Sequence, residues 1–463
     1  MRSWPGSSAR GGFRSSLYLL GLTYQGFGGV LLAFAFLAFL WREDARGFAL
    51  AALLGFGLGR LLQALGHPEA QPRRAEVFAS VALLWLAVPL LGAVPYWVSG
   101  GLGYLDALFE AVSGFTTTGA TVLTDFGRFG QSLFLWRGFT QWMGGIGIVL
   151  LFLVVFPQLQ VAGRQAFFAE ATGVEKEKLT PRLRHTAQAV LRVYLLLTAL
   201  AFLAYLGAGV PAFEALANAL ATTPAGGFSP NPQSFAAYPP LAHWAGSFFM
   251  FLAGVNFILQ YRLLFGREVG PLLRDPEFRA YGTLTLLAGA LLASTFTPTT
   301  STARGKPPPR LLPGGFHPHH HGLRQRGLRR VGGTRPGGAG LPHVRGGERG
   351  LGAGGIKVVR WLLLFGFLRR EITRTLHPQA VLPLRLGARV VSEEALRQVS
   401  VFVFLYTAFR RGNLALALLE KDFVVAFTAS AQAIGNIGPG LGPVGPMALT
   451  PASIPSPRGS SSS

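Results

Sequence analysis

Two short stretches of the chain contain residue types whose spacing suits the coordination of a cation. Residues 109–121 and 213–229 each begin with Phe-Glu-Ala, continue as a short apolar segment and end in hydroxyl residues and glycine. A third variant, 435–440, follows the apolar segment 422–434. Main-chain carbonyl groups in such loops can replace the water shell of an ion. The repetition therefore predicts an ion filter built from equivalent loops.

The glycines and hydroxyl residues of these loops are the candidate filter residues. Glycine permits the unusual φ and ψ angles and the close backbone approach that a filter strand needs. Each loop follows the carboxyl end of a short helix, where partial negative charge favours a cation. No ring of charged side chains is required, which suits a dehydrated monovalent cation better than a divalent one. The candidates are Thr116, Thr117, Thr118, Gly119, Ala120, Ala225, Gly226, Gly227, Phe228, Asn436, Ile437, Gly438 and Pro439.

Long apolar runs surround the three loops. A membrane-spanning helix needs about 20 apolar residues. Irregular backbone at membrane depth is tolerated only where it is buried in protein or lines a water-filled cavity. We therefore expect the loops to be re-entrant segments between spanning helices. The predicted spans lie near 17–41, 47–65, 77–98, 136–156, 188–208, 241–265 and 280–297, with later candidates at 353–368 and 398–419.

The composition is that of a membrane protein. Half of the 463 residues are hydrophobic, 13% are charged and the mean hydropathy is +0.39, which predicts a polytopic membrane protein rather than a soluble enzyme. The chain contains no cysteine, which excludes disulfides and cysteine-ligated metals. The apolar run from Leu17 is too long for a signal peptide, so we expect no cleavable leader.

The net charge of +22 is explained by loops rather than by nucleic-acid binding. Basic residues gather between the apolar runs, as the positive-inside rule predicts for loops on the cytoplasmic side. This pattern predicts a multi-pass protein of the inner (cytoplasmic) membrane. The three clusters are Arg164, Lys176, Lys178, Arg182 and Arg184; Arg262, Arg267, Arg274 and Arg279; and Arg369, Arg370, Arg374, Arg385 and Arg389.

The spacing of the motifs indicates internal repeats. Glu110 and Glu214 lie 104 residues apart and are expected to occupy equivalent places in two pore helices. Repeats of this size argue for pseudosymmetry around a central axis. The predicted fold is an all-α polytopic membrane protein with four pseudo-repeated helix–pore-loop–helix units around one pore, preceded by an extra helix pair. The pair is expected at 15–70 and the pore units at 76–158, 183–267, 276–372 and 392–463.

Residues 303–352 interrupt this pattern. The segment is rich in Arg, Gly, Pro and His and has almost no apolar run. One permitted choice of codons in a GC-rich back-translation from Arg310, read one base later, yields another Phe-x-Ala and Thr-Thr-Thr-Gly pattern where a repeat unit is due. We therefore hypothesise a reading-frame error over 298–352, and a second one after 446, where a closing apolar helix is expected. Resequencing tests this, because an uninterrupted frame that encodes the His-rich segment would contradict it.

The quoted motifs resemble those of the Trk/Ktr/HKT superfamily of potassium transporters, in particular the bacterial Trk-type membrane subunit. The resemblance covers about 15–300 and 353–446. The first, second and fourth filters of that family match 116–121, 225–229 and 436–440, although Pro224 and Ala225 replace the usual Ser-Thr-like residues. The family's gating loop ends in Gly-Gly-Ile-Lys, which matches Gly354, Gly355 and Lys357 and the residue between them.

The resemblance implies a function, a cargo and partners. It implies potassium uptake with potassium at the filter residues, no covalent cofactor, a homodimer in membrane lipid and a cytosolic nucleotide-binding regulatory subunit. The third filter and the closing helix of the fourth unit are absent as written. The chain as written is therefore predicted to fold poorly or to be inactive, and the frame-corrected chain to be competent.

Several alternatives stay open from the residues alone. A membrane-embedded enzyme would need clustered catalytic groups, and the apolar runs offer too few ionisable residues, so we predict no enzyme. A secondary carrier of another solute, or a non-functional relic, is the alternative to potassium uptake. Glu110 and Glu214 fit mouth carboxylates that hydrogen-bond loop backbone or attract cations better than they fit a proton relay. Lys357 suits a gate or a snorkelling helix end. Potassium or sodium selectivity, and channel or symport coupling, remain undetermined.

Overall fold

The computed structural model describes the chain between residues 8 and 436 with gaps, and it is almost entirely helical there. The exception to the helical pattern is a short antiparallel pair, β1 (Arg385–Leu386) and β2 (Arg389–Val390). The described residues are 8–67, 74–123, 125–155, 179–295, 357–377, 379, 382–386, 389–417, 427 and 436.

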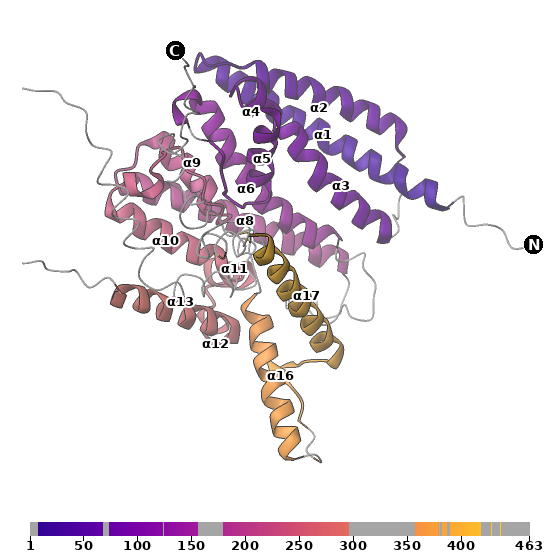
Figure 1. The fold of residues 1–463 in the computed structure, drawn as a ribbon, viewed down its shortest axis with the longest axis vertical. Helices are drawn as coiled ribbons and strands as arrows, with labels where there is room; N and C mark the ends of the chain where they lie inside the picture. The colour runs from indigo at the N-terminus through magenta and orange to yellow at the C-terminus, as the bar shows by residue number, and fades with distance from the viewer. Residues whose placement is uncertain are drawn as a thin grey trace, which may run out of the picture.

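The N-terminal helices α1 (Ser8–Leu40) and α2 (Arg46–Leu65) form a hairpin that lies beside α3 (Arg74–Gly92) at one edge of the molecule (Figure 1). Glycines allow the two backbones to approach closely. A Cβ on Gly21 would lie 2.6 Å from the Gly59 carbonyl oxygen, and one on Gly55 would lie 3.0 Å from the Gly28 Cα. The predicted extra helix pair is therefore present.

Two successive groups of helices follow, with the same order of elements. The shared order is a long helix, a short helix that ends in an extended loop, and a helix that leads away from the loop. The first group is α3, α4 (Val94–Val98), α5 (Tyr104–Phe115), η1 (Phe126–Arg128) and α6 (Gln131–Val155). The second is α8 (Leu179–Gly207), α9 (Ala212–Thr222), η3 (Ser234–Ala237), α10 (Pro240–Gly254) and α11 (Phe257–Gly266).

An aromatic cluster joins the N-terminal hairpin to the first group. The Trp136 ring of α6 lies 5.0 Å from Phe34 and 5.8 Å from Phe48, centroid to centroid. Its indole nitrogen donates to the Gly92 carbonyl at 3.1 Å. Aromatic pairs at these distances stabilise a core beyond the area they bury. The hairpin is therefore packed firmly against the helices that carry the first loop.

The predicted span 241–265 is wrong as a single helix, because α10 and α11 are bent by 106°. The Asn256 side chain accepts a hydrogen bond from the Ile258 backbone N–H at 2.9 Å and so caps α11. The Gln260 amide donates to the Leu252 and Val255 carbonyls at 2.8 and 3.0 Å. These polar side chains satisfy the helix-terminal groups that a break exposes.

The described residues contain four helices that are long and apolar enough to cross a membrane, or five if the bent pair is one span. These helices also expose large apolar side chains such as Leu32, Phe36 and Leu203. Surface of that kind is expected where lipid is the solvent. The four are Ser16–Leu40, Arg46–Leu65, Val81–Val98 and His185–Gly207, and the pair is α10–α11.

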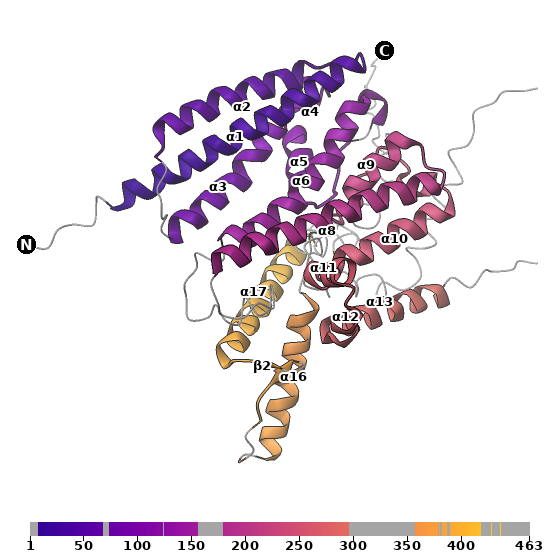
Figure 2. The same ribbon diagram turned by 180° about the vertical axis from the view of Figure 1, so that it is seen from behind.

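The C-terminal helices extend away from the rest of the molecule in both views (Figures 1 and 2). The Arg360 guanidinium of α16 (Val358–Leu376) lies 3.8 Å from the Phe402 ring centroid of α17 (Glu393–Ala417), and Arg370 donates to Glu393 at 3.2 Å. The later predicted spans, 353–368 and 398–419, overlap α16 and α17, but neither helix is among the described helices that are long and apolar enough to cross a membrane. The two helices are preceded by α12 (Val269–Arg274) and α13 (Pro276–Thr295).

Candidate ion filter

The first candidate loop leaves the carboxyl end of α5 through a left-handed turn. Thr117 has φ 58° and Gly119 has φ 75°. The Thr117 N–H donates to the Gly114 carbonyl and the Thr118 N–H to the Ser113 carbonyl, both at 2.9 Å. The loop is thus folded back on the last turn of the short helix, as the hydroxyl and glycine pattern predicts.

The second loop repeats this turn residue by residue. Ala225 has φ 55° and Gly227 has φ 87°. The Ala225 N–H donates to the Thr222 carbonyl at 2.9 Å, and the Gly226 N–H donates to the Ala221 carbonyl at 2.8 Å. Each of these positions lies 108 residues after its counterpart in the first loop. The two loops therefore have the same backbone conformation. Their equivalent residues are 108 positions apart.

This register corrects the predicted equivalence of Glu110 and Glu214. At a spacing of 108 residues the counterpart of Glu110 is Asn218, and both side chains are fully buried, whereas Glu214 is partly exposed. The shared Phe-Glu-Ala letters are four positions, about one helical turn, out of step with the loops. Asn218 donates to the Tyr238 hydroxyl at 3.0 Å. Burial raises the pKa of Tyr238 to about 12, so this phenol is neutral at physiological pH.

The fourth candidate loop reaches the first one through Asn436. This residue has φ 51°, like Thr117 and Ala225. Its Nδ2 donates to the Thr116 carbonyl at 2.6 Å, and its Oδ1 contacts the Thr118 hydroxyl. The predicted filter residues Ile437, Gly438 and Pro439, and the predicted gate residues Gly354 and Gly355, lie outside the described residues.

The first and second loops meet at their glycines. A Cβ on Gly119 would lie 1.9 Å from the Gly226 carbonyl oxygen, and a Cβ on Gly226 would lie 2.5 Å from the Gln141 amide. Contacts under 3.0 Å are not compatible with a Cβ unless the atoms it meets move, which are backbone atoms of Gly226 in the first case and the side chain of Gln141 in the second. The structure therefore brings together the predicted residues of 116–120 and 225–228, and it explains why glycine stands at these two positions.

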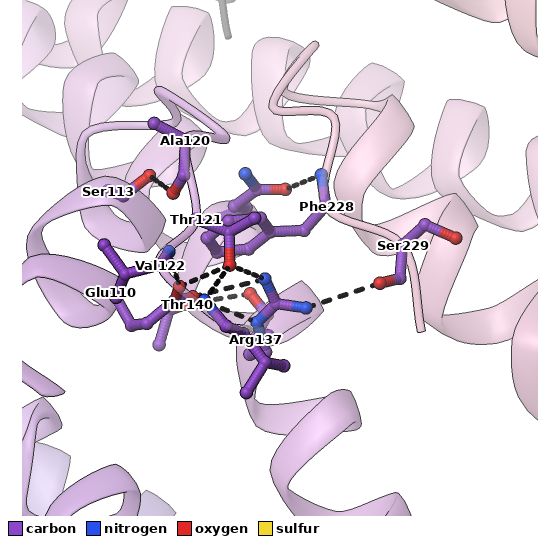
Figure 3. Close-up of polar contacts among 11 residues, drawn as sticks. Glu110, Ser113, Ala120, Thr121, Val122, Arg137, Thr140, Phe228 and Ser229 are labelled. Carbon is purple, nitrogen blue, oxygen red and sulfur yellow. Dashed lines mark hydrogen bonds and ion pairs between the residues drawn. The ribbon is translucent and has the colours of Figure 1, made fainter. Parts of the chain in front are cut away.

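The carbonyl oxygens of the loops differ in what they contact. The Ala120 carbonyl accepts from the Ser113 hydroxyl of α5 at 2.6 Å (Figure 3). Among hydrogen bonds between described residues, none is made to the carbonyls of 117–119 or 225–228. Carbonyl groups without a protein donor are the ones that can face a dehydrated cation. Ala120 and Thr116, whose carbonyl accepts from Asn436, therefore differ from residues 117–119 and 225–228, because their carbonyls are engaged by the protein.

A buried ion pair lies behind the first two loops. The Glu110 carboxylate of α5 and the Arg137 guanidinium of α6 are 3.2 Å apart, with side chains 0% and 2% exposed. Glu110 accepts from the Val122 N–H at 2.7 Å and from the Thr121 hydroxyl. Arg137 also donates to the Ser229 carbonyl at 3.3 Å. Figure 3 shows Arg137 between Glu110 and Thr121 on one side and Ser229 on the other.

Part of this arrangement was predicted and part was missed. The prediction that Glu110 hydrogen-bonds loop backbone agrees with its bond to Val122. The partner Arg137 was missed, although an arginine at the start of the predicted span 136–156 is a signal, because ionisable residues in spanning segments are rare. Lys357 directly precedes α16, next to a helix start where the Val359 N–H donates to Glu277 of α13 at 3.3 Å. Its role in a gate stays a prediction.

Comparison with known proteins identifies relatives along most of the chain. The family described as TrkH, cation transport protein, matches residues 47–297 and 345–454. The chain is 32% identical over 441 residues to the Trk system potassium uptake protein TrkH of Salmonella typhimurium, covering 93% of this chain and 91% of that protein. It is 31% identical over 387 residues to the Trk system potassium uptake protein TrkG of Escherichia coli, covering 80% and 78%.

A solved structure gives the same result for the fold. The crystal structure of the potassium transporter TrkH from Vibrio parahaemolyticus superposes with a TM-score of 0.75 at 26% sequence identity, covering 94% of each chain. The likeness supports the predicted all-α polytopic membrane fold and the predicted resemblance to Trk-type subunits. The chain belongs to the TrkH family of cation transport proteins.

Proposed function

We propose that this chain takes up potassium across the cytoplasmic membrane through a filter lined by main-chain carbonyl oxygens. The observation that carries the proposal is the left-handed turn that recurs at Thr117, Ala225 and Asn436. Glycine follows two positions later each time, at 119, 227 and 438. Such a turn at the carboxyl end of a short helix presents carbonyl groups where the helix dipole also favours a cation.

Potassium is the proposed cargo because several relatives are named potassium uptake proteins and because the loops offer no charged ring. Divalent cations are usually held by carboxylates. The charged side chains near the first two loops, Glu110 and Arg137, are paired with each other. A neutral ring of carbonyl groups suits a weakly hydrated monovalent cation.

The proposed working assembly includes other components. The relatives are named as parts of a Trk system, which supports the expectation of a cytosolic nucleotide-binding regulatory subunit. We also propose a homodimer in the inner membrane, as the resemblance implies. The basic clusters flanking α11–α13 and α16 then face the cytoplasm under the positive-inside rule. The division into four pore units around one pore belongs to the same proposal.

The reading-frame hypothesis concerns the segment between the two matched ranges. The family match stops at residue 297 and resumes at 345, so the family model leaves 298–344 unmatched. This interval lies within the predicted disrupted segment 298–352 and is shorter than it. We propose that a one-base correction there restores a third Thr-Thr-Thr-Gly loop.

The function is tested by expressing the full chain, as written and with the corrected frame, in cells that lack their own potassium uptake systems. The frame-corrected chain is expected to support growth at low potassium and to take up rubidium, while the chain as written is expected to fail. Failure of both versions, with both present in the membrane, would overturn the proposed potassium uptake. Uptake by the chain as written would overturn the frame hypothesis alone.

A further inference from the structure

We propose that Arg137 is a positioning residue that holds the first and second filter loops at a fixed spacing, and thereby contributes to discrimination between monovalent cations. The inference deepens the proposed function and rests on it. Arg137 does not itself contact the ion in this proposal. It acts through the residues that flank the two loops.

The contacts to the first loop are made directly and through Glu110. The Arg137 Nη2 donates to the Thr121 hydroxyl at 3.0 Å, and its Nε donates to Glu110 at 3.2 Å. Glu110 in turn accepts from the Thr121 hydroxyl and the Val122 N–H. Thr121 lies two residues after Gly119. A shift of the guanidinium would therefore move the exit of the first loop.

The contacts to the second loop are made at the equivalent position. The Arg137 Nη1 donates to the carbonyl of Ser229, which lies two residues after Gly227. The guanidinium carbon also lies 4.1 Å from the Phe228 ring centroid, within the range of a cation–π contact. One turn further along α6, Gln141 accepts from the Phe228 N–H at 3.1 Å. The same face of α6 therefore holds both loops.

The charge of the guanidinium is compensated where it lies. Burial of an unpaired charge is costly, and removing one partner of a buried pair leaves the other charge uncompensated. Here the pair is fully buried, and the positive charge of Arg137 is balanced by Glu110 behind the filter. Arg137 can therefore hold the two loops beside a cation path without adding a net positive charge to that path.

Only a guanidinium supplies this set of bonds. Arginine offers five donors in a rigid planar fork, whereas lysine is a point charge with a single nitrogen. An Arg137→Lys variant keeps the charge opposite Glu110. It cannot at the same time reach Thr121 and the Ser229 carbonyl, which different nitrogens of Arg137 bind. The substitution therefore separates the spacing role from the need for a positive charge.

The test measures ion selectivity in whichever version of the full chain takes up potassium. Arg137→Lys is expected to lower the preference for potassium over sodium by about tenfold, because loops that are no longer held at one spacing can also close around the smaller sodium ion. The matched control is Arg128→Lys, at an exposed ion pair with Asp125 in the same loop region. It is expected to keep the wild-type preference. The amount of protein in the membrane is measured in parallel.

A second pair of variants keeps the test decisive if Arg137→Lys does not accumulate. Thr121→Val removes the hydroxyl that binds both Glu110 and Arg137, and Thr121→Ser retains it. The valine variant is expected to lose selectivity and the serine variant to retain it. If Arg137→Lys and Thr121→Val, or whichever of them accumulates in the membrane, keep the wild-type preference for potassium over sodium, the inference is overturned. Absence of uptake by both unsubstituted versions would instead overturn the proposed function on which it rests.

Discussion

At the scale of single residues, the candidate filter depends on positions where only certain residue types fit. Gly119 and Gly227 adopt a left-handed conformation that costs an ordinary L-residue about 1–2 kcal/mol. Thr117 and Ala225 accept that conformation although each carries a Cβ. Strained backbone of this kind clusters at functional sites, and here it recurs at equivalent places in two loops.

Gly119→Ala is expected to abolish potassium uptake. The new Cβ would lie 1.9 Å from the Gly226 carbonyl oxygen at a φ of 75°, so the two loops must separate. Rubidium uptake into cells measures the loss. Gly26→Ala in α1 is the matched control, because a Cβ there has no atom within 4 Å. Wild-type uptake by the Gly119→Ala variant would contradict the close approach of the loops.

Much of the site could be predicted at this scale, because glycine and hydroxyl residues after a short apolar helix carry the signal locally. The residues that position the loops could not. The pairing of Glu110 with Arg137 joins α5 to α6. The sequence around Glu110 does not specify a partner 27 residues away. The equivalence of Glu110 and Glu214 failed because repeated letters need not share a helical register, and Asn218 occupies the equivalent position.

At the scale of elements, polar side chains from distant parts of the chain stabilise helix ends whose positions the hydropathy pattern does not reveal. The Glu43 carboxylate, from the turn between α1 and α2, accepts from the Gln131 and Ser132 N–H groups at 2.6 and 2.8 Å. It thus caps α6 from a distant part of the chain. Carboxylates at helix N-termini satisfy free N–H groups and interact favourably with the helix dipole.

Glu43→Ala is expected to lower the free energy of unfolding by about 1–2 kcal/mol, because a helix N-terminus loses its cap. The midpoint of thermal unfolding in detergent measures the change. Glu268→Ala is the comparison, since Glu268 pairs with Arg262 at the surface and such pairs contribute about 0–1 kcal/mol. Equal, negligible shifts for both variants would argue against a stabilising cap at Glu43.

Gln260→Leu is expected to destabilise the bend between α10 and α11 by about 1–3 kcal/mol, since buried carbonyl groups lose their donor. The carbonyls of Leu252 and Val255 are the groups left unpaired. The midpoint of thermal unfolding in detergent and the uptake of rubidium into cells are measured for the same variant. Gln398→Leu, at an exposed position on α17, serves as the control. An unchanged unfolding midpoint for Gln260→Leu would contradict the assigned role.

The bend also explains why one predicted span was wrong. Hydropathy recorded a continuous apolar run across 241–265, and hydropathy does not respond to two side chains that satisfy a broken backbone. Asn256 and Gln260 are buried. Their hydrogen bonds to the backbone at the bend allow an apolar segment to be interrupted without leaving those groups unpaired. Polar amides in a predicted span are therefore the signal that could have located the break.

At the scale of the whole molecule, the chain is a helical membrane protein of the TrkH family. The prediction that it is not an enzyme is confirmed by that membership, because the matched relatives are potassium uptake proteins. The first two loops lie together between α5, α6 and α9, and Asn436 joins the fourth candidate loop to the first. This architecture was predictable because the apolar runs are long enough to span a membrane. The contacts between distant segments were not predictable from the sequence.

The most direct test of the carbonyl filter is competition for rubidium uptake in liposomes that contain the purified, uptake-competent full chain. Potassium is expected to halve rubidium uptake at a concentration near that of rubidium itself. Sodium is expected to need a concentration at least about tenfold higher, which corresponds to about 1.4 kcal/mol of discrimination. Equal competition by sodium and potassium, or no rubidium uptake at all, would contradict a potassium filter at these loops.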